Sequence, residues 1–328
     1  AAIPPPAPAT ALVIGAVIAG ASVAHALARR GTAVTVIERA TVASDASGNP
    51  AGVFFPPLPK RWNRAAAWYF SAFSFVQQIQ PWWRTARVPH GMIGLLRLPR
   101  DAAEDSALQE LHARTGLPAD IVRYLDQNEA STHAGISLTS GAAWIPQSGW
   151  ISPAAWCAAL LSHPAITVLE GVGVQELSRT HEGWSARLTS GKTLATPCCV
   201  VAAAHETASL LAPYGLRLGA VGGQVSEGTL TPHLPSTILC RKGYAIPLGS
   251  HALMGATYHR EGLRDVTPQR HAENTAEIAA MSDTMRESTF AVSAIGSLAP
   301  SCASPGFTTI GLPPSSAMPA AKLKRVRV

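Results

Sequence analysis

The segment from residue 11 to residue 38 constrains the fold more strongly than any other part of the sequence. An apolar run ends at Gly15, a helix-type segment follows, and a second apolar run ends at Glu38. This order is typical of the βαβ unit that binds the ADP half of a dinucleotide. We therefore expect Gly15 to form a tight turn, Gly20 to let helix and strand pack closely, and Glu38 to accept ribose hydroxyls. The amides at the helix N-terminus are expected to face a pyrophosphate.

One position departs from the dinucleotide fingerprint. In the pattern Gly-x-Gly-x-x-Gly, Val17 stands in place of the middle glycine. That glycine lets the backbone approach the pyrophosphate, so a β-branched side chain is expected to crowd the phosphates. The spacing therefore predicts the fold more firmly than it predicts nucleotide binding. A βαβ unit that binds nothing is the alternative interpretation.

The composition is compatible with a negatively charged partner. The 328 residues carry a formal net charge of +6, and the pI is about 9.3. Charged residues make up only 14% of the chain, against roughly 25% in an average protein. The basic balance suits a polyanion such as RNA. Part of the excess lies in the tail 322–327, and such basic tails are more often solvated than specific sites.

Cysteine spacing and hydropathy indicate a cytoplasmic protein. None of the five cysteines forms a Cys-x-x-Cys pair, so reduced thiols are expected. No apolar run reaches the ~18 residues that a membrane span needs, and the first residues are not expected to act as a signal peptide. Residues 1–10 are proline-rich and are expected to form a linker within a longer polypeptide.

The remaining pattern alternates helices with short strands and predicts an α/β fold. Helices are expected at 64–84, 102–115, 118–124, 154–161 and 271–286, the fourth beginning at Ser152-Pro153. Strands are expected at 91–98, 166–169, 172–177, 184–188, 199–204, 221–227, 236–239, 244–247 and 253–258, with strand and turn at 141–151. Residues 293–319, rich in Ser, Pro, Ala and Gly, are expected to form no packed element.

The order of these elements predicts two interleaved domains. The first is a nucleotide-binding domain with a parallel sheet, built from residues 11–85, 152–215 and 291–328. The second is a largely antiparallel substrate domain, built from residues 86–151 and 216–290. The reason is the return to alternating strands and helices after an unlike middle stretch.

Several short segments also resemble a known family and occur in its order over about residues 11 to 280. They are Ile18-Ala-Gly-Ala-Ser22, Ala46-Ser-Gly-Asn-Pro-Ala-Gly52, Gly149-Trp-Ile-Ser-Pro153, Gly223-Gln-Val-Ser226, Gly243-Tyr-Ala-Ile-Pro247, Gly255-Ala-Thr-Tyr258 and His271-Ala-Glu-Asn274. The chain resembles the C-terminal, FAD-dependent oxidoreductase half of the bifunctional tRNA 5-methylaminomethyl-2-thiouridine biosynthesis proteins. The resemblance implies a glutathione-reductase-type FAD-binding domain of the amino-acid-oxidase class, interleaved with an antiparallel-sheet substrate domain.

The resemblance also implies an activity. The cofactor would be FAD and the substrate the wobble uridine of tRNA. The secondary amine of 5-carboxymethylaminomethyl-2-thiouridine would be oxidised, the carboxymethyl group would leave, and 5-aminomethyl-2-thiouridine would remain. Because the flavin accepts the hydride, no protein base is strictly required and no catalytic residue is assigned. A methyltransferase dependent on S-adenosylmethionine, fused upstream, is a further implied partner.

The family's site residues carry over by position. The cofactor residues implied are Gly15, Val17, Ile18, Ala19, Gly20, Glu38, Arg39, Ser47, Gly48, Asn49 and Val174. Ser47, Gly48 and Asn49 would lie beside the flavin or pyrophosphate, and the backbone of Val174 would meet the adenine. Tyr244 and Thr257 are candidates for the face where the substrate meets the flavin.

The sequence also departs from the family pattern, and the departures cluster on the cofactor side. His205 replaces a turn glycine, Gly222 a common arginine, Ser301 an arginine and Gly306 an aspartate. A glycine-rich segment that closes over the flavin in relatives, with its following helix, is missing. With Val17, these changes suggest a truncated or degenerate copy. We therefore expect weak FAD binding and little turnover on tRNA.

Two other functions remain open at this point. An oxidase of glycine or sarcosine would need an arginine for the substrate carboxylate, and neither Gly222 nor Ser301 supplies one. A non-catalytic remnant, acting as an RNA-binding scaffold, would keep the fold alone. Trp82 and Trp83 could stack on RNA bases, but we expect them to pack in the core. We expect His271 to have a structural role.

Overall fold

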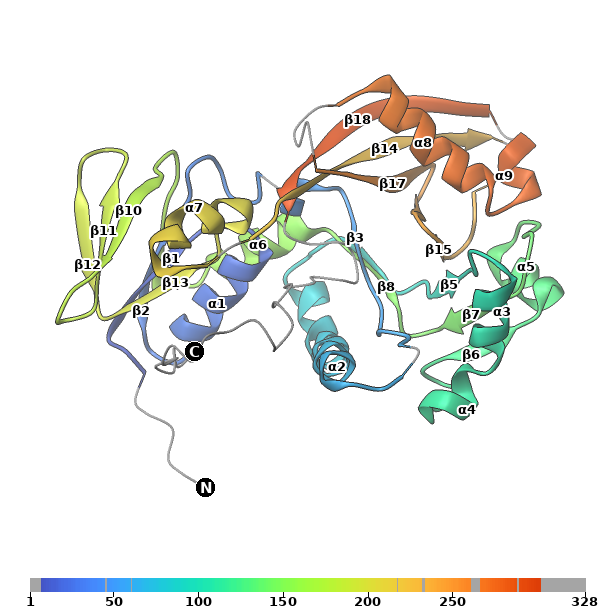
Figure 1. Cartoon of the computed structure of the whole chain (residues 1–328), viewed down its shortest axis with the longest axis horizontal. Helices are drawn as coiled ribbons and strands as arrows, with labels where there is room; N and C mark the ends of the chain where they lie inside the picture. Colours follow the sequence, from blue (N-terminus) through green and yellow to red (C-terminus); the bar gives the residue numbers. More distant parts are fainter. Residues whose placement is uncertain are drawn as a thin grey trace.

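The computed structural model describes residues 7–44, 46–59, 61–216, 218–231, 234–260, 266–287 and 289–301. Figure 1 shows two halves side by side, a parallel sheet with its helices at one end and a large, mostly antiparallel sheet at the other. The long helix α2 (Arg64–Thr85) lies between them. Within the described residues, no helix is long and apolar enough to cross a membrane.

The parallel half is built from three layers. Its central sheet has the order β13-β1-β2-β9, with every pair parallel. The strands are β1 (Thr10–Ile14), β2 (Ala33–Ile37), β9 (Ile166–Leu169) and β13 (Cys198–Val201). Helices α1 (Ile18–Ala28) and α6 (Pro153–Leu161) pack on one face. A three-stranded antiparallel sheet covers the other, formed by β10 (Val174–Arg179), β11 (Trp184–Leu188) and β12 (Thr193–Thr196).

The side-chain alternation of β1 shows why both faces are covered. Successive side chains of a strand point to opposite faces. Val13 packs in the cluster beneath the helices, whereas Leu12 and Ile14 pack in the cluster beneath the three-stranded sheet. All three are buried. A continuous apolar run of this kind is typical of a parallel strand that is buried on both sides.

The second half is an eight-stranded sheet of order β18-β14-β17-β16-β15-β5-β7-β6. Its strands are β5 (Leu95–Arg97), β6 (Arg123–Leu125), β7 (Ala142–Ile145), β14 (Val221–Thr231), β15 (Ile238–Cys240), β16 (Tyr244–Leu248), β17 (His251–His259) and β18 (Thr289–Ser301). All pairs are antiparallel except β15 with β5. One sheet therefore joins strands from before residue 151 and after residue 216.

Smaller elements complete the described chain. Helices α8 (Pro268–Ala279) and α9 (Asp283–Glu287) lie beside β14 and β17, as Figure 1 shows. The remaining helices are α3 (Ala102–Gln109), α4 (Leu111–Thr115), α5 (Gln127–Ala134) and α7 (Thr207–Leu211). Short 3-10 turns occur at Ala46–Gly48, Ala204–Glu206 and Ala212–Tyr214. A small sheet pairs β3 (Gly52–Phe54), β8 (Gly149–Ile151) and β4 (His90–Gly91).

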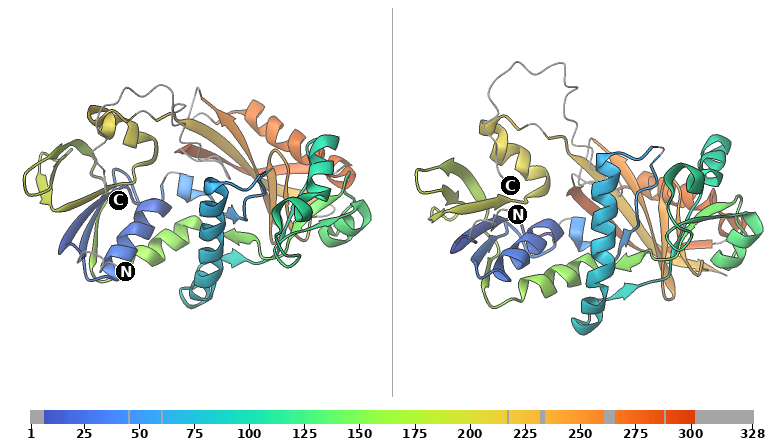
Figure 2. Two further views of the ribbon diagram at one scale, coloured as in Figure 1. Left: turned by 60° about the horizontal axis from the view of Figure 1, so that its bottom comes forward. Right: turned by 90° about the horizontal axis from the view of Figure 1, so that it is seen from below.

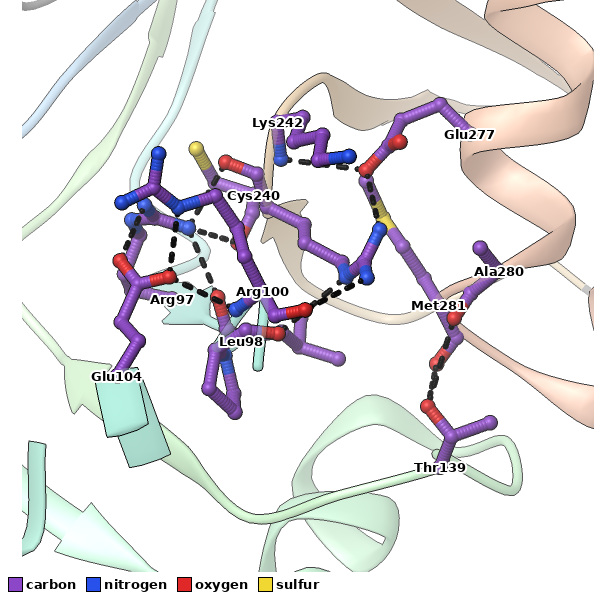
Figure 3. Close-up of polar contacts among 12 residues, drawn as sticks. Arg97, Leu98, Arg100, Glu104, Thr139, Cys240, Lys242, Glu277, Ala280 and Met281 are labelled. Atoms are coloured by element: carbon purple, nitrogen blue, oxygen red, sulfur yellow. Dashed lines mark hydrogen bonds and ion pairs between the residues drawn. The ribbon is translucent and has the colours of Figure 1, made fainter. Parts of the chain in front are cut away.

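Ionic contacts fasten the junction between β5 and β15, as Figure 3 shows. Arg97 pairs with Glu104 at 3.0 Å and donates to the carbonyl of Arg241 at 2.8 Å. Arg241 pairs in turn with Glu277 of α8 at 2.9 Å. The side chains of both arginines are only 18% exposed. These bonds tie α3, the β15–β16 turn and α8 together across long sequence separations.

One predicted helix is absent from the structure. Residues 118–124 are not helical, because the carbonyl of Pro118 closes a turn and Arg123–Leu125 pairs with β7. The helix predicted at 64–84 is confirmed as α2, which continues through Pro81 to Thr85 while Trp82 and Trp83 pack into the core.

The C-terminal prediction is also wrong in part. Residues 289–301 form a strand that pairs with β14, so 291–301 belongs to the eight-stranded sheet rather than to the nucleotide-binding half. Residues from 302 onward, including Gly306 and the basic tail, lie outside the described residues. The other domain boundaries remain a prediction.

Candidate functional site

The turn after β1 depends on a glycine. Gly15 has φ +104°, and its amide donates to the carbonyl of Ile37 at 2.8 Å. A Cβ on Gly15 would lie 2.4 Å from the carbonyl oxygen of Ala202, at the end of β13. The positive φ and the close backbone together exclude a side chain. The chain therefore turns sharply where β1, β2 and β13 end.

Helix α1 is seated directly on this turn. A Cβ on Gly20 would lie 1.9 Å from the carbonyl oxygen of Gly15, far inside a normal contact. Gly20 is buried in the first turn of the helix. The second glycine therefore fixes the position of the α1 N-terminus over the carboxyl edge of the sheet.

Glu38 ends β2 and faces the same turn. Its side chain is only 6% exposed. One carboxylate oxygen accepts from the amide of Ala16 at 2.8 Å, and the other accepts from the amide of Ala40 at 3.0 Å. Each oxygen keeps further acceptor capacity, because an ionised carboxylate offers about four lone-pair sites. Glu38 thus braces the turn and still has room for hydroxyl donors.

A cavity of about 400 Å³ opens at this edge. It is lined by the turn and by the ends of the neighbouring strands. The lining residues are Ile14, Gly15, Val17, Ile37, Glu38, Arg39, Gly171, Val172, Gly173, Val174, Gln175, Thr189, Ala202, Ala203, Ala204, Glu206, Ser209 and Leu210. Five of the residues expected to hold a cofactor, Gly15, Val17, Glu38, Arg39 and Val174, come together here. Its size is within the usual range for small-molecule sites.

An ion pair spans two sides of the cavity lining. The guanidinium of Arg39, directly after Glu38, pairs with the carboxylate of Glu206. The side chains are 35% and 38% exposed, so water screens much of the attraction. The pair links the end of β2 to the turn after β13.

The N-terminus of α1 is capped from another segment. Val17 is the N-cap residue and has no side-chain acceptor. The hydroxyl of Ser47 instead accepts from the amide of Ile18 at 3.0 Å. Ser47 is buried beside Cys157, whose thiol pKa is raised to about 12 by burial. Ser47 therefore substitutes for the missing cap of the helix.

The neighbouring candidate residues lie around this cap. Ile18 and Ala19 are exposed at the start of α1, and Gly48 is exposed in its turn. Asn49 donates to the carbonyl of Ala46 at 2.9 Å and holds the turn closed. The predicted loop is thus next to the helix N-terminus, outside the cavity lining.

The two candidates for the substrate face have different surroundings. Thr257 on β17 is 8% exposed, and its hydroxyl accepts from the amide of Gln224 at 3.2 Å. Tyr244 on β16 packs against an apolar cluster. Burial raises the pKa of Tyr244, so its phenol stays protonated at neutral pH. The structure does not bring either residue into the cavity described above.

The turn after β13 corrects one prediction. His205 was expected at a glycine position, but Ala204 is the left-handed residue, with φ 47°. A left-handed backbone favours glycine, because a Cβ crowds the neighbouring carbonyl. The departure from glycine therefore lies one residue earlier. Ala204 lines the cavity, and the buried Nδ1 of His205 has no hydrogen-bond partner among the described residues.

Other predicted roles are resolved by packing. His271 on α8 contacts the hydroxyl of Ser226 at 2.8 Å beneath the helix. Trp83 is 2% exposed, and Trp82 packs on Trp156. The expectations of a structural histidine and of core tryptophans are confirmed.

Sequence reasoning missed part of the cavity wall. Gly171, Gly173, Thr189, Glu206 and Ser209 line it and were not among the candidates. The first two closely follow β9, a parallel strand whose carboxyl end lies at the same edge as that of β2. Glycines at that edge are a signal that could have indicated them.

Comparison with known proteins agrees with this architecture. The sequence matches the family described as DAO, FAD dependent oxidoreductase, over residues 10–312. The chain belongs to this family, whose members are FAD-dependent oxidoreductases acting on CH–NH bonds, and its cofactor is FAD.

Several curated relatives share the name tRNA 5-methylaminomethyl-2-thiouridine biosynthesis bifunctional protein MnmC. The protein from Thiobacillus denitrificans is 36% identical over 283 residues, covering 83% of this chain and 45% of the relative. That from Paraburkholderia phytofirmans is 34% identical over 295 residues, covering 84% and 44%. The chain thus spans less than half the length of these relatives.

Solved structures show the same fold. Glycine oxidase from Geobacillus kaustophilus superposes with a TM-score of 0.74 at 22% identity, covering 88% of this chain and 82% of that one. Iminodiacetate oxidase from Chelativorans sp. BNC1 gives a TM-score of 0.71 at 21% identity, covering 89% and 84%. The expected fold class, a parallel FAD-binding sheet with an antiparallel substrate sheet, is confirmed.

The described residues fit FAD at the adenosine end. The glycine turn brings the α1 N-terminus over a cavity that contains a buried carboxylate with acceptor capacity left, as a ribose requires. Val17 lines this cavity. Its φ of −86° is a conformation that any residue can adopt, so the backbone at this position does not require glycine. The side chain therefore affects binding through the space it fills.

Proposed function

We propose that this chain oxidises the secondary amine of 5-carboxymethylaminomethyl-2-thiouridine in tRNA, leaving 5-aminomethyl-2-thiouridine. The observation that carries the proposal is the similarity to MnmC proteins over more than four fifths of the chain. Membership of the FAD-dependent oxidoreductases that act on CH–NH bonds supports the reaction type. A tRNA substrate would place this activity in the cytoplasm.

The proposed division of labour follows from the cavity. Glu38 and the backbone at Val174 hold the adenosine, and the α1 N-terminus at Ile18 and Ala19 faces the pyrophosphate. FAD, when bound, would supply the acceptor for a hydride from the carboxymethyl carbon next to the amine nitrogen, with loss of the amine proton. Water would then hydrolyse the resulting C=N bond, which leaves the aminomethyl group on the uridine and releases the two-carbon fragment as glyoxylate. The protein's own contribution is to bind and orient both partners.

We assign the substrate side to the sheet formed by β14, β16 and β17. Burial raises the pKa of Tyr244, and burial together with Tyr244 and Cys240 raises the pKa of Tyr258. Both phenols are therefore protonated donors at neutral pH. Tyr244 and Thr257 remain the proposed lining of the face toward the flavin.

The test is conversion of carboxymethylaminomethyl-uridine in tRNA with excess FAD, followed by nucleoside mass spectrometry. We expect aminomethyl-uridine to accumulate slowly, because FAD is held loosely. Glycine and sarcosine, offered to the same FAD-loaded protein, should not reduce the flavin. Reduction by these amino acids without conversion of tRNA would favour a small-molecule oxidase. A protein that retains no FAD at saturating concentration would instead be a non-catalytic remnant.

A further inference from the structure

Helix α2 presents an aromatic face to solvent that the proposed reaction does not use. Trp68 is 74% exposed and Phe75 is 58% exposed. They are seven residues apart, which places them on one side of the helix, about 10 Å apart along its axis. Figure 2 shows α2 at the front of the molecule in both views. Together they form an apolar strip on an otherwise polar helix side, and exposed apolar surface with a polar rim is a candidate interaction site.

The part of the sequence that contains this helix is basic. Between Ala46 and Arg100 there are seven Lys and Arg residues and no Asp or Glu, and two of the seven, Arg97 and Arg100, pair with Glu104 of α3. Arg61 and Arg64 are exposed at the start of α2, and no ion-pair partner exists for either among the described residues. The N-terminal end of a helix adds positive potential.

We propose that the outer face of α2 binds single-stranded RNA, with bases stacked on Trp68 and Phe75 and a phosphate held at Arg61 and Arg64. Aromatic platforms beside arginines bind single strands because every base has a π-face and every phosphate a charge. Ser71 and Ala72 lie between the rings on this face and are small, which leaves space over the helix. The proposal rests on the proposed function, since the RNA would be the loop that carries the substrate uridine.

Protein partners fit this face less well. A stable protein interface buries about 800 Å² on each side. Two aromatic side chains supply at most about 250 Å² each, and serine and alanine between them add little. The surplus of arginine without any carboxylate on α2 also matches a polyanion better than a second copy of this basic chain. RNA is therefore the occupant that the charge favours.

The experiment measures binding of a fluorescent anticodon stem-loop RNA to the FAD-loaded full chain by anisotropy. We expect Trp68→Ala and Phe75→Ala each to weaken binding about tenfold. Trp68→Tyr keeps a ring and should bind like the parent protein. Arg64→Gln should reduce the salt dependence by about 0.7 in the log–log slope. Arg29→Gln, an exposed arginine at the end of α1, is the matched charge control and should change little.

Thermal melting and sedimentation distinguish RNA binding on α2 from unfolding and from a protein contact. Because Trp68 is largely exposed, its truncation should leave the melting temperature unchanged, so weaker binding would not reflect unfolding. Unchanged RNA binding in the Trp68→Ala and Phe75→Ala double variant would overturn the proposal. A change in sedimentation without a change in RNA binding would also overturn it, and would make the face a protein contact. Conversion of modified tRNA by that double variant would leave the proposed function standing.

Discussion

The contact between Gly20 and the carbonyl of Gly15 makes a quantitative prediction. In Gly20→Ala, the new Cβ would lie 1.9 Å from that oxygen, and real Cβ atoms essentially never come within 3.0 Å of a neighbour. The turn and the helix must therefore separate by about 1 Å. Forcing extra volume into a packed site typically costs about 1–3 kcal/mol. Because the clashing atom is a backbone oxygen that cannot rotate away, we expect a cost at the upper end of this range, about 3 kcal/mol.

Helix propensity acts in the opposite direction. Alanine is about 1 kcal/mol more favourable than glycine inside a helix. We therefore expect Gly20→Ala to lower the free energy of unfolding by about 2 kcal/mol net. The displaced turn should also weaken FAD binding, because the amides at the N-terminus of α1 and the carboxylate of Glu38 would no longer be directed toward the same ligand.

Urea unfolding of the apoprotein and titration with FAD by flavin fluorescence measure the two effects. Gly219→Ala is the matched control, since no atom lies within 4 Å of the position of its Cβ. That variant should stay within about 0.5 kcal/mol of the parent protein. The packing argument would be refuted if the Gly20→Ala protein were as stable as the parent or more stable. Helix propensity would then be the dominant effect.

Three further predictions concern the same molecule. Ala204→Gly should raise the free energy of unfolding by about 0.5–1 kcal/mol in urea titration, because it removes the left-handed strain at φ 47°; no gain would contradict that account. Val17→Gly should tighten FAD binding at least about tenfold in the fluorescence titration, since overpacking is relieved, and tight stoichiometric FAD in the parent would contradict it. Burial opposes ionisation of Glu104, but bonds from Arg100 and the charge of Arg97 outweigh it and hold its pKa below the ordinary 4.5. Its stabilising contribution is therefore present above about pH 4.5 and is lost as the pH falls through the folded-state pKa; Glu104→Gln should flatten this acid limb in pH-dependent unfolding.

The sequence predicts the parallel half well because its signals are local. Gly15, Gly20 and Glu38 have roles that follow from spacing within a single βαβ unit, and the structure places all three at one edge. Ser152 was expected to start a helix, and its hydroxyl accepts from the amide of Ala155 at 3.4 Å. Such caps depend on the residues next to them and on little else.

The features that sequence could not predict depend on distant partners. Residues 118–124 look helical in isolation, and only pairing with β7 makes their end a strand. Strand β18 lies in a segment of weak pattern and is specified by its register with β14. The identity of the left-handed residue near β13, Ala204 rather than His205, requires the backbone itself. Neither composition nor periodicity carries that information.

The outward face of α2 is a further case. The aromatic and apolar content of 64–84 predicts a helix, and the structure buries Ala66 and Phe73 on one side of it. Helical periodicity then assigns Trp68 and Phe75 to the side opposite Phe73. The exposure of these two rings is visible only when the packed face is known.

The strand order has a consequence for how the chain folds during synthesis. Strand β1 lies between β2 and β13, and β13 is made more than 180 residues after β1. Until β13 has been synthesised, one edge of β1 lacks the strand with which it pairs in the finished sheet. Strand β5 likewise waits for β15, which pairs residues 95–97 with residues 238–240. Contacts this distant in sequence slow folding and expose unpaired edges. A nascent chain released before residue 198 therefore lacks both partners, and we expect it to aggregate or to depend on chaperones rather than to fold as an independent nucleotide-binding unit.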